Sequence, residues 1–256
     1  MRVSLFITCL VDLFQPEVGE ATVKLLRAAG CEVSVPLAQT CCGQPAWNSG
    51  FAHEAAKVAR TTLAALEADG GDAVVVPAGS CATMVRVFWT ELFEVVGDHD
   101  ARTRAEALGK RTYELSEFLA LHPVPLLPLV PEAAAQEVAY HHSCHMLREL
   151  RIENQPVDLL GAAGCSAVAW PDDRRCCGFG GLFSVKLPET SVAMADEKLD
   201  SLPSDVATLV GSDGSCLMHL RSRLEERGST IRVRHLAEIL AERLPPTKPY
   251  DGVHGS

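Results

Sequence analysis

The sequence predicts an α/β protein made of two tandem, duplicated domains, each with a small doubly wound and mostly parallel sheet. Four cysteines of the first half recur in the second half at a constant offset of 135 residues, which indicates an internal duplication. Short apolar segments alternate with amphipathic ones, as in α/β proteins. A proline-rich segment, 123–131, separates the halves. We therefore place the first domain at 1–122, a linker at 123–136 and the second domain at 137–256.

The first half begins with an apolar run that predicts a buried strand, after which helices and strands alternate. The predicted strands cover residues 3–9, 32–35 and 73–77. The predicted helices cover 17–29, 48–68 and 80–95; Gly30 ends the first of them and Ser80 caps the last. Because sites in such sheets collect beyond the carboxyl ends of strands, we expect one near Cys9 and Cys81.

The second half repeats this order. Its predicted strands cover 137–142, 166–170 and 206–210, and a last helix covers about 235–243. Cys144 and Cys216 follow the first and third of these strands, as Cys9 and Cys81 do in the first half. A second site is therefore expected at the corresponding edge of the second sheet.

The composition excludes several kinds of partner. The chain has 256 residues, and 23 basic against 33 acidic side chains give a net charge of −10, which repels nucleic acids and anionic lipid surfaces. Its most apolar linker, 119–130, is broken by three prolines, and the apolar start at 3–11 ends at Asp12 with no cleavage pattern after it. We expect a soluble cytoplasmic protein without nucleic-acid partners or membrane insertion.

Ten cysteines in this chain are too few for a disulfide scaffold, so their clustering indicates metal ligation. The repeated skeleton comprises two sets of four. The first cysteine set is Cys9, Cys41, Cys42 and Cys81, and the second cysteine set is Cys144, Cys176, Cys177 and Cys216. Sets of four thiolates bind zinc, copper(I) or iron–sulfur clusters.

The adjacent cysteine pairs favour a cluster over a single ion. Neighbouring Cα atoms lie about 3.8 Å apart with diverging side chains, whereas zinc ligands are usually separated by two to four residues. Gly43 and Gly178 directly follow the pairs, and a glycine there permits a positive φ that turns backbone amides toward sulfur. We predict one or two iron–sulfur clusters, of the [4Fe-4S] type, with a structural zinc site or a thiol–disulfide centre as alternatives.

The doubled skeleton resembles the cysteine-rich CCG domain found in heterodisulfide reductases and in the iron–sulfur component of glycolate oxidases. The compact two-domain form, with Gly-Ser-Cys at the last cysteine of each set, is most similar to the lactate utilisation protein A family. The resemblance covers residues 3–244. It implies an electron-transfer component that oxidises L-lactate to pyruvate together with partner subunits, or else a component of a glycolate- or heterodisulfide-type oxidoreductase. No glycine-rich nucleotide motif is present, so a flavin or nicotinamide would bind another subunit.

One departure from the resembling proteins concerns a fifth cysteine. Heterodisulfide reductase-like members carry Cys-x-x-Cys where this chain has Cys81-x-x-Met84 and Cys216-x-x-His219. Either four ligands suffice, or these side chains replace the missing thiolate, since a helical residue three positions on faces the same side. Met84 is more typical of a core residue, while His219 stays a candidate ligand.

Other side chains near the skeleton are weaker candidates. Cys31 and Cys165 are expected to be buried core residues. The histidines around Cys144 are possible ligands or bases, and candidates for a proton relay beside the second cysteine set: His141, His142 and His145. Four cations are predicted to offset a thiolate-rich centre, to hold a carboxylate substrate, or to lie on the surface: Arg148, Arg174, Arg175 and Lys186.

Overall fold

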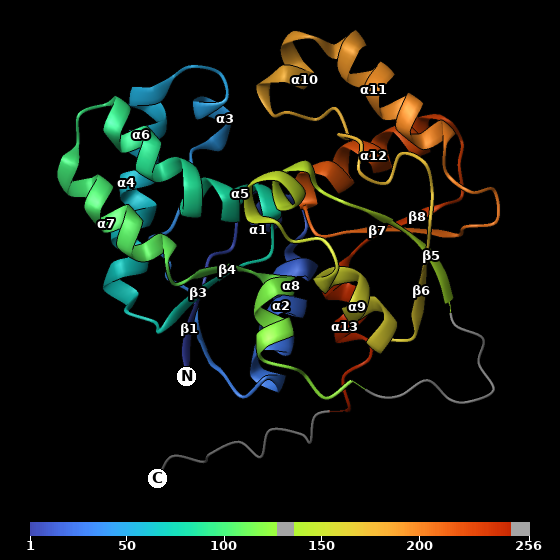
Figure 1. Cartoon of the computed structure of the whole chain (residues 1–256), viewed down its shortest axis with the longest axis horizontal. Coiled ribbons are helices and arrows are strands. Elements are labelled where there is room, and N and C mark those ends of the chain that lie inside the picture. Colours follow the sequence, from blue (N-terminus) through green and yellow to red (C-terminus); the bar gives the residue numbers. More distant parts are fainter. Residues whose placement is uncertain (127–135, 247–256) are drawn as a thin grey trace.

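The computed structural model describes residues 1–126 and 136–246 (Figure 1). Two four-stranded sheets, in which all neighbouring strands are parallel, have the equivalent orders β2-β1-β3-β4 and β6-β5-β7-β8. The strands are β1 (Arg2–Leu5), β2 (Glu32–Ser34), β3 (Ala73–Val76), β4 (Thr112–Glu114), β5 (Gln136–His141), β6 (Cys165–Val168), β7 (Thr208–Gly211) and β8 (Arg232–His235). The predicted duplicated α/β fold is confirmed.

Helices connect the strands of the first half and cover both faces of its sheet. They are α1 (Cys9–Phe14), α2 (Pro16–Ala28), α3 (Gln44–Trp47), α4 (Ala52–Asp69), α5 (Gly79–Thr83), the π-helical turn η1 (Met84–Phe88), α6 (Trp89–Val95), α7 (His99–Gly109) and α8 (Leu115–Leu121). Pro16 begins α2, where its missing N–H costs no hydrogen bond. Gly70 ends α4 in the left-handed conformation, with φ of +68°.

The second half has the corresponding arrangement with shorter connections. Its helices are the π-helical turn η2 (Met146–Leu150), α9 (Gln155–Ala162), α10 (Leu182–Lys186), α11 (Pro188–Asp200), α12 (Gly214–Glu226) and α13 (Leu236–Ala241). No helix in either described range is both long and apolar enough for a membrane span.

The two halves share one hydrophobic core. Helices α2 and α8 of the first half pack against α13 and α9 of the second, between the two sheets (Figure 1). This shared core contains side chains such as Leu25 and Phe118 from the first half and Leu160 and Leu240 from the second, all at most 1% exposed. Two further clusters cover the outer faces, one over each sheet. The halves are therefore joined through buried apolar surface.

Several boundaries differ from the prediction. Strand β1 ends at Leu5, and Cys9 is the first residue of α1. The fourth strand of each sheet, β4 and β8, was not predicted, and the helix expected over 80–95 is interrupted by the π-helical turn η1. The predicted cap at Ser80 is wrong, because α5 begins at Gly79 after the extended residue Ala78. Of the predicted linker, 127–135 lie outside the described residues.

Candidate metal centre

The cysteines lie where six chain segments, three from each half, meet beyond the carboxyl ends of the strands. Cys9 begins α1 after β1, and Cys81 lies in α5 after β3. Cys144 follows β5, and Cys216 lies in α12 after β7. The Cys-Cys pairs lie in loops that precede α3 and α10. This placement agrees with the expectation for parallel sheets of this kind.

In the first cysteine set, the four thiols form two close pairs. The Cys9 thiol donates toward the Cys41 sulfur at 3.4 Å, and the Cys42 thiol toward the Cys81 sulfur at 3.2 Å. Hydrogen bonds from Cys42 and Cys9 lower the pKa of Cys41 far below its usual range. These hydrogen bonds favour the thiolate form of Cys41, which is the form of cysteine that binds metals.

The second cysteine set has the same internal order. Hydrogen bonds from Cys144 and Cys177 lower the pKa of Cys176, the counterpart of Cys41, far below its usual range. The pKa of Cys177 is raised, because its thiol donates hydrogen bonds to Cys176 and Cys216 and is buried. Each half thus brings its four sulfurs together, and all ten cysteines of the chain, which lie in the described ranges, are free thiols.

The glycines after the cysteine pairs are required by the backbone geometry. Gly43 and Gly178 have φ of +87° and +86°. Their amides point at the sulfur of the first cysteine of each pair, at 3.5 Å from Cys41 and Cys176. A Cβ at Gly43 would lie 2.9 Å from the Ala55 carbonyl oxygen. These loops can therefore place a backbone donor beside a thiolate only with glycine at this position.

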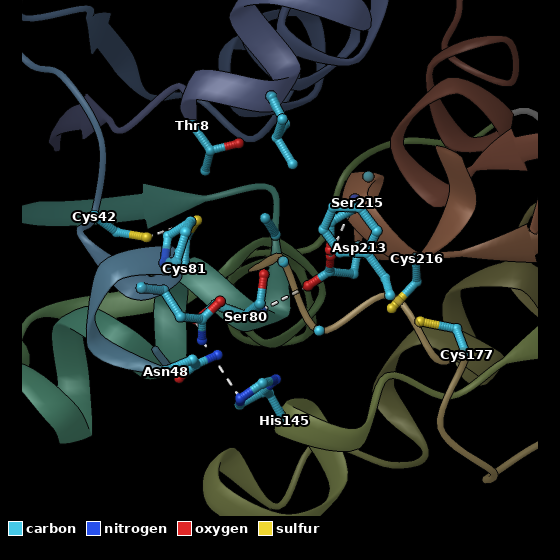
Figure 2. Close-up of a pocket in the computed structure, with 18 of the residues that line it drawn as sticks. Thr8, Cys42, Asn48, Ser80, Cys81, His145, Cys177, Asp213, Ser215 and Cys216 are labelled. Atoms are coloured by element: carbon cyan, nitrogen blue, oxygen red, sulfur yellow. Dashed lines mark hydrogen bonds between the residues drawn. The ribbon is translucent and has the colours of Figure 1, made fainter. Parts of the chain in front are cut away.

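All eight cysteines of the two sets line a single cavity of about 280 Å³ between the halves. Figure 2 shows Cys42 and Cys81 on one side and Cys177 and Cys216 on the other, with Ser80 and Asp213 between them. No lysine or arginine of the described ranges lines this cavity. The donor set consists of soft sulfur atoms, four of them buried and four partly buried, which suits a thiolate-bound metal or iron–sulfur cluster.

The segments that carry Cys81 and Cys216 contact the opposite half in equivalent ways. A Cβ on Gly79 would meet the Met146 side chain at 2.2 Å, and one on Gly214 would meet the Val11 side chain at 3.7 Å, with Gln15 nearer still. Val11 and Met146 occupy equivalent positions of the repeat. The contacts are therefore related by an approximate twofold symmetry, as the duplication predicts.

Several polar contacts cross the interface beside the cavity. The Ser80 backbone N–H donates to a carboxylate oxygen of the buried Asp213 at 2.7 Å. The Gln44 amide nitrogen donates to the Ser80 carbonyl at 3.0 Å and lies 3.4 Å from His145 Nε2, while His145 Nδ1 lies 3.8 Å from the Cys144 sulfur. Polar groups thus link the two cysteine sets.

The remaining predicted residues lie outside the cavity. The Nε2 atom of His219 lies 3.2 Å from the Oγ atom of Ser191. Met84 is fully buried in the cluster over the first sheet. Cys31 and Cys165 belong to the shared core, as expected. The four cations near the second cysteine set also lie away from the cavity lining, and two of them form exposed ion pairs, Arg174 with Glu153 and Arg175 with Glu197.

Three residues near the centre have a position in the structure that the sequence did not assign to them individually. His141 offers a ring nitrogen within 4.8 Å of the sulfurs of Cys177 and Cys216. Burial lowers the pKa of His141 well below its ordinary value, so the ring is neutral. Lys198 is fully buried under the same site, with its ammonium 4.4 Å from the centre of the Trp170 ring. The third of these residues is Asp213, which is buried and lines the cavity.

A comparison of equivalent repeat positions reveals two of these residues. His141 corresponds to Phe6 of the first half, and Lys198 corresponds to Leu63. Both first-half residues are fully buried, so they fill the same places with apolar side chains. In the sequence, these two residues could have been found by aligning the two halves. Each is polar at a position where the first half has an apolar residue.

The fold and site define a duplicated cysteine-rich α/β protein. The sequence profile of the CCG family, described as a cysteine-rich domain, matches residues 3–86 and 138–221. The chain therefore belongs to the CCG cysteine-rich family and carries two copies of its domain.

Over nearly its whole length the chain is similar to proteins named Lactate utilization protein A. It is 46% identical to that of Exiguobacterium sp. over 245 residues, which are 94% of this chain and 97% of that protein. It is 43% identical to that of Geobacillus sp. and 41% identical to that of Bacillus subtilis, in each case over 247 residues that cover 95% of this chain and all of the relative.

Proposed function

We propose that this protein is the iron–sulfur electron-transfer component of a multi-subunit cytoplasmic system that oxidises L-lactate to pyruvate. The observation that carries the proposal is the convergence of two sets of four cysteine thiols on one cavity. The name of the relatives, Lactate utilization protein A, supports the choice of pathway.

Each half supplies the groups that an iron–sulfur cluster needs. The four cysteines of each set would be its ligands, with Cys41 and Cys176 held as thiolates. The amides of Gly43 and Gly178, which point at these two sulfurs, would donate to the bound sulfur atoms. A bound cluster would supply one-electron transfer.

The cavity favours electron transfer over direct binding of the hydroxy acid. A carboxylate substrate normally meets an arginine or lysine, and the described lining offers neither. The buried Asp213 carboxylate would also repel an anion there. We therefore expect lactate to react on a partner subunit, and the purified protein alone to leave lactate unoxidised.

Zinc is the second candidate for the bound metal. The close group formed by His141, Cys177 and Cys216 has the mixed nitrogen and sulfur donors that a single zinc ion also accepts. A zinc site would make the protein a structural scaffold of the same complex.

Anaerobic purification separates these candidates. An iron–sulfur protein is brown, contains iron and acid-labile sulfide, and loses visible absorption when dithionite reduces it. Electron paramagnetic resonance of the reduced sample would then give the cluster type. A colourless protein with stoichiometric zinc would contradict the iron–sulfur proposal and support the scaffold.

Deletion of the gene tests the pathway. The deletion strain should fail to grow on L-lactate and should grow normally on pyruvate, because only the oxidation step is lost. Reintroduction of the wild-type gene should restore growth. Normal growth on lactate combined with loss of growth on glycolate would contradict the lactate assignment and point to a glycolate-type oxidoreductase.

A further inference from the structure

We propose that His141 is a direct ligand of the metal centre in the second half, so that the two centres of the chain have different ligand sets. This inference rests on the proposed function in one respect, namely that the second cysteine set holds a metal or a cluster. The geometry points to it: one nitrogen of His141 and the sulfurs of Cys177 and Cys216 all lie within 4.8 Å of one another.

The lack of hydrogen-bond partners at the His141 ring supports its role as a metal ligand. The side chain is 1% exposed, and neither ring nitrogen has a hydrogen-bond partner within the described ranges. A buried polar group without a partner costs about 1–3 kcal/mol, so such groups need an explanation. A neutral imidazole that faces two thiols has its lone pair free, and metal coordination would satisfy it.

The position of His141 on the backbone makes the ring well placed to bind. It is the last residue of β5, and Gly211 pairs with it on the neighbouring strand β7. A ligand on a central strand is held more firmly than one on a loop. The two cysteines come from different segments, the Cys-Cys loop and α12, so the three donors converge from separate directions.

The first half provides a natural comparison. Its equivalent residue, Phe6, is fully buried and has no donor atom, and Leu63 replaces the buried Lys198. The first centre must therefore be held by thiolates alone, whereas the second gains a neutral nitrogen ligand. Replacement of thiolate by imidazole raises the reduction potential of clusters. We expect the second centre to have the higher potential and to be the acceptor of the pair.

His219, the candidate from the sequence, is less suitable. Its Nε2 lies 3.2 Å from Ser191 Oγ and 3.4 Å from the Ser191 carbonyl oxygen, so this nitrogen already has partners. The ring is half-buried, whereas that of His141 is 1% exposed and lies beside the sulfurs of Cys177 and Cys216. The two histidines therefore make a matched pair for a test.

The experiment uses the full chain with Cys41→Ser and Cys42→Ser, which leaves only the second centre, labelled with ¹⁵N-histidine. After anaerobic reduction, pulsed electron paramagnetic resonance should detect strong coupling to a histidine nitrogen. His141→Phe, which introduces the residue that the first half tolerates, should remove the coupling, and His219→Ala should retain it. A cluster without this coupling in the parent protein, or coupling lost in His219→Ala alone, would overturn the inference while the proposed function stands.

A cobalt titration tests the same ligand without a cluster. Apo-protein with the same Cys41→Ser and Cys42→Ser background should bind Co²⁺ with thiolate charge-transfer bands, and His141→Phe should weaken binding more than about tenfold and shift the d–d bands. If the isolated protein contains no iron, the proposed function fails, yet this titration still decides on His141. Identical Co²⁺ spectra and affinities in the two proteins would overturn the inference.

Discussion

The backbone N–H of Ser80 in the first half donates to the buried carboxylate of Asp213 in the second half at 2.7 Å. The other carboxylate oxygen of Asp213 accepts from the N–H and hydroxyl of Ser215, at the start of α12. One side chain therefore holds the segments of Cys81 and Cys216 together, and charged hydrogen bonds of this kind contribute more than neutral ones.

Asp213→Ala should destabilise the whole chain, because it leaves the buried Ser80 amide without a partner at a cost of about 1–3 kcal/mol. The free energy of unfolding from urea titration measures this. Asp98→Ala is the control, since Asp98 caps α7 within one half and at the surface, where loss of a cap costs about 1 kcal/mol. Equal losses in the two variants would contradict a special role of the interface contact.

Gly43→Ala should lower the iron content of the first centre and the free energy of unfolding more than Gly50→Ala does. Both glycines have a positive φ, +87° and +83°, so both variants carry a strain of about 1–2 kcal/mol. Only Gly43 also lies against backbone, with the Ala55 oxygen 2.9 Å from a Cβ, whereas nothing lies within 4 Å at Gly50. Iron content and unfolding free energy measure the difference, and equal effects would show that the loop can shift freely.

Trp89→Phe should weaken the first centre selectively. Trp89 is fully buried, and its Nε1 donates to the Cys42 carbonyl oxygen at 2.8 Å. Without this donor the carbonyl loses its partner, at a cost of about 1–3 kcal/mol. Iron bound by protein with Cys176→Ser and Cys177→Ser reports on the first centre alone.

Trp170→Phe is the control for Trp89→Phe, because Trp170 donates to the Tyr140 carbonyl oxygen at 3.1 Å in the other half. It should lower stability and leave iron in the first centre unchanged. A similar loss of iron in the two variants would mean that reduced stability alone, and not the position of Cys42, determines loading.

Combined Cys41→Ser and Cys42→Ser should lower the iron content by about half when both centres are loaded, because each set has its own four ligands. Cys31→Ala is the matched control: Cys31 is buried in the shared core and its removal should leave iron unchanged. Unchanged iron in the double variant would show that the first centre carries none.

Glu114→Gln should flatten the pH dependence of stability. Burial raises the pKa of Glu114 from 4.5 to about 7, so between these values the folded protein binds more protons than the unfolded one. Stability from this group is therefore present at low pH and is lost as the pH rises to about 7, by up to about 1.4 kcal/mol per pH unit. Urea unfolding of both proteins at about pH 5 and pH 8 measures the difference, and parallel pH profiles would contradict it.

Much of the fold was accessible from the sequence because the duplication fixes equivalent positions. The constant offset between Cys9 and Cys144 places the strands that precede them in register, and the first three strands of each sheet follow. The fourth strands escaped prediction because they are short and carry polar residues: β4 is Thr-Tyr-Glu and β8 alternates arginine with valine before His235. The alternation in β8 is the period of a strand, but it covers too few residues to stand out from the surrounding loop.

Less of the site could be predicted from the sequence, because its composition depends on which surfaces of the two halves pack together. The sequence assigns the eight cysteines to two sets, but it does not reveal that both sets open on one cavity. It also favoured His219 by its spacing from Cys216, whereas the structure brings His141 to the sulfurs of Cys177 and Cys216. A strand residue and a helix residue converge there through tertiary packing, which local spacing does not encode.

The shared core between α2 and α13 has a consequence for the origin of the chain. A protein with a single copy of the repeat would expose the apolar face that includes Leu25 and Leu26, or Leu236 and Leu240. Such a face is covered most simply by a second identical copy across a twofold axis. Duplication of one gene for such a dimer, followed by fusion of the two copies, would give the shared core that the two halves form here. Fusion freed each half to change alone, and Phe6 and His141 occupy positions that an identical pair of subunits would have kept the same.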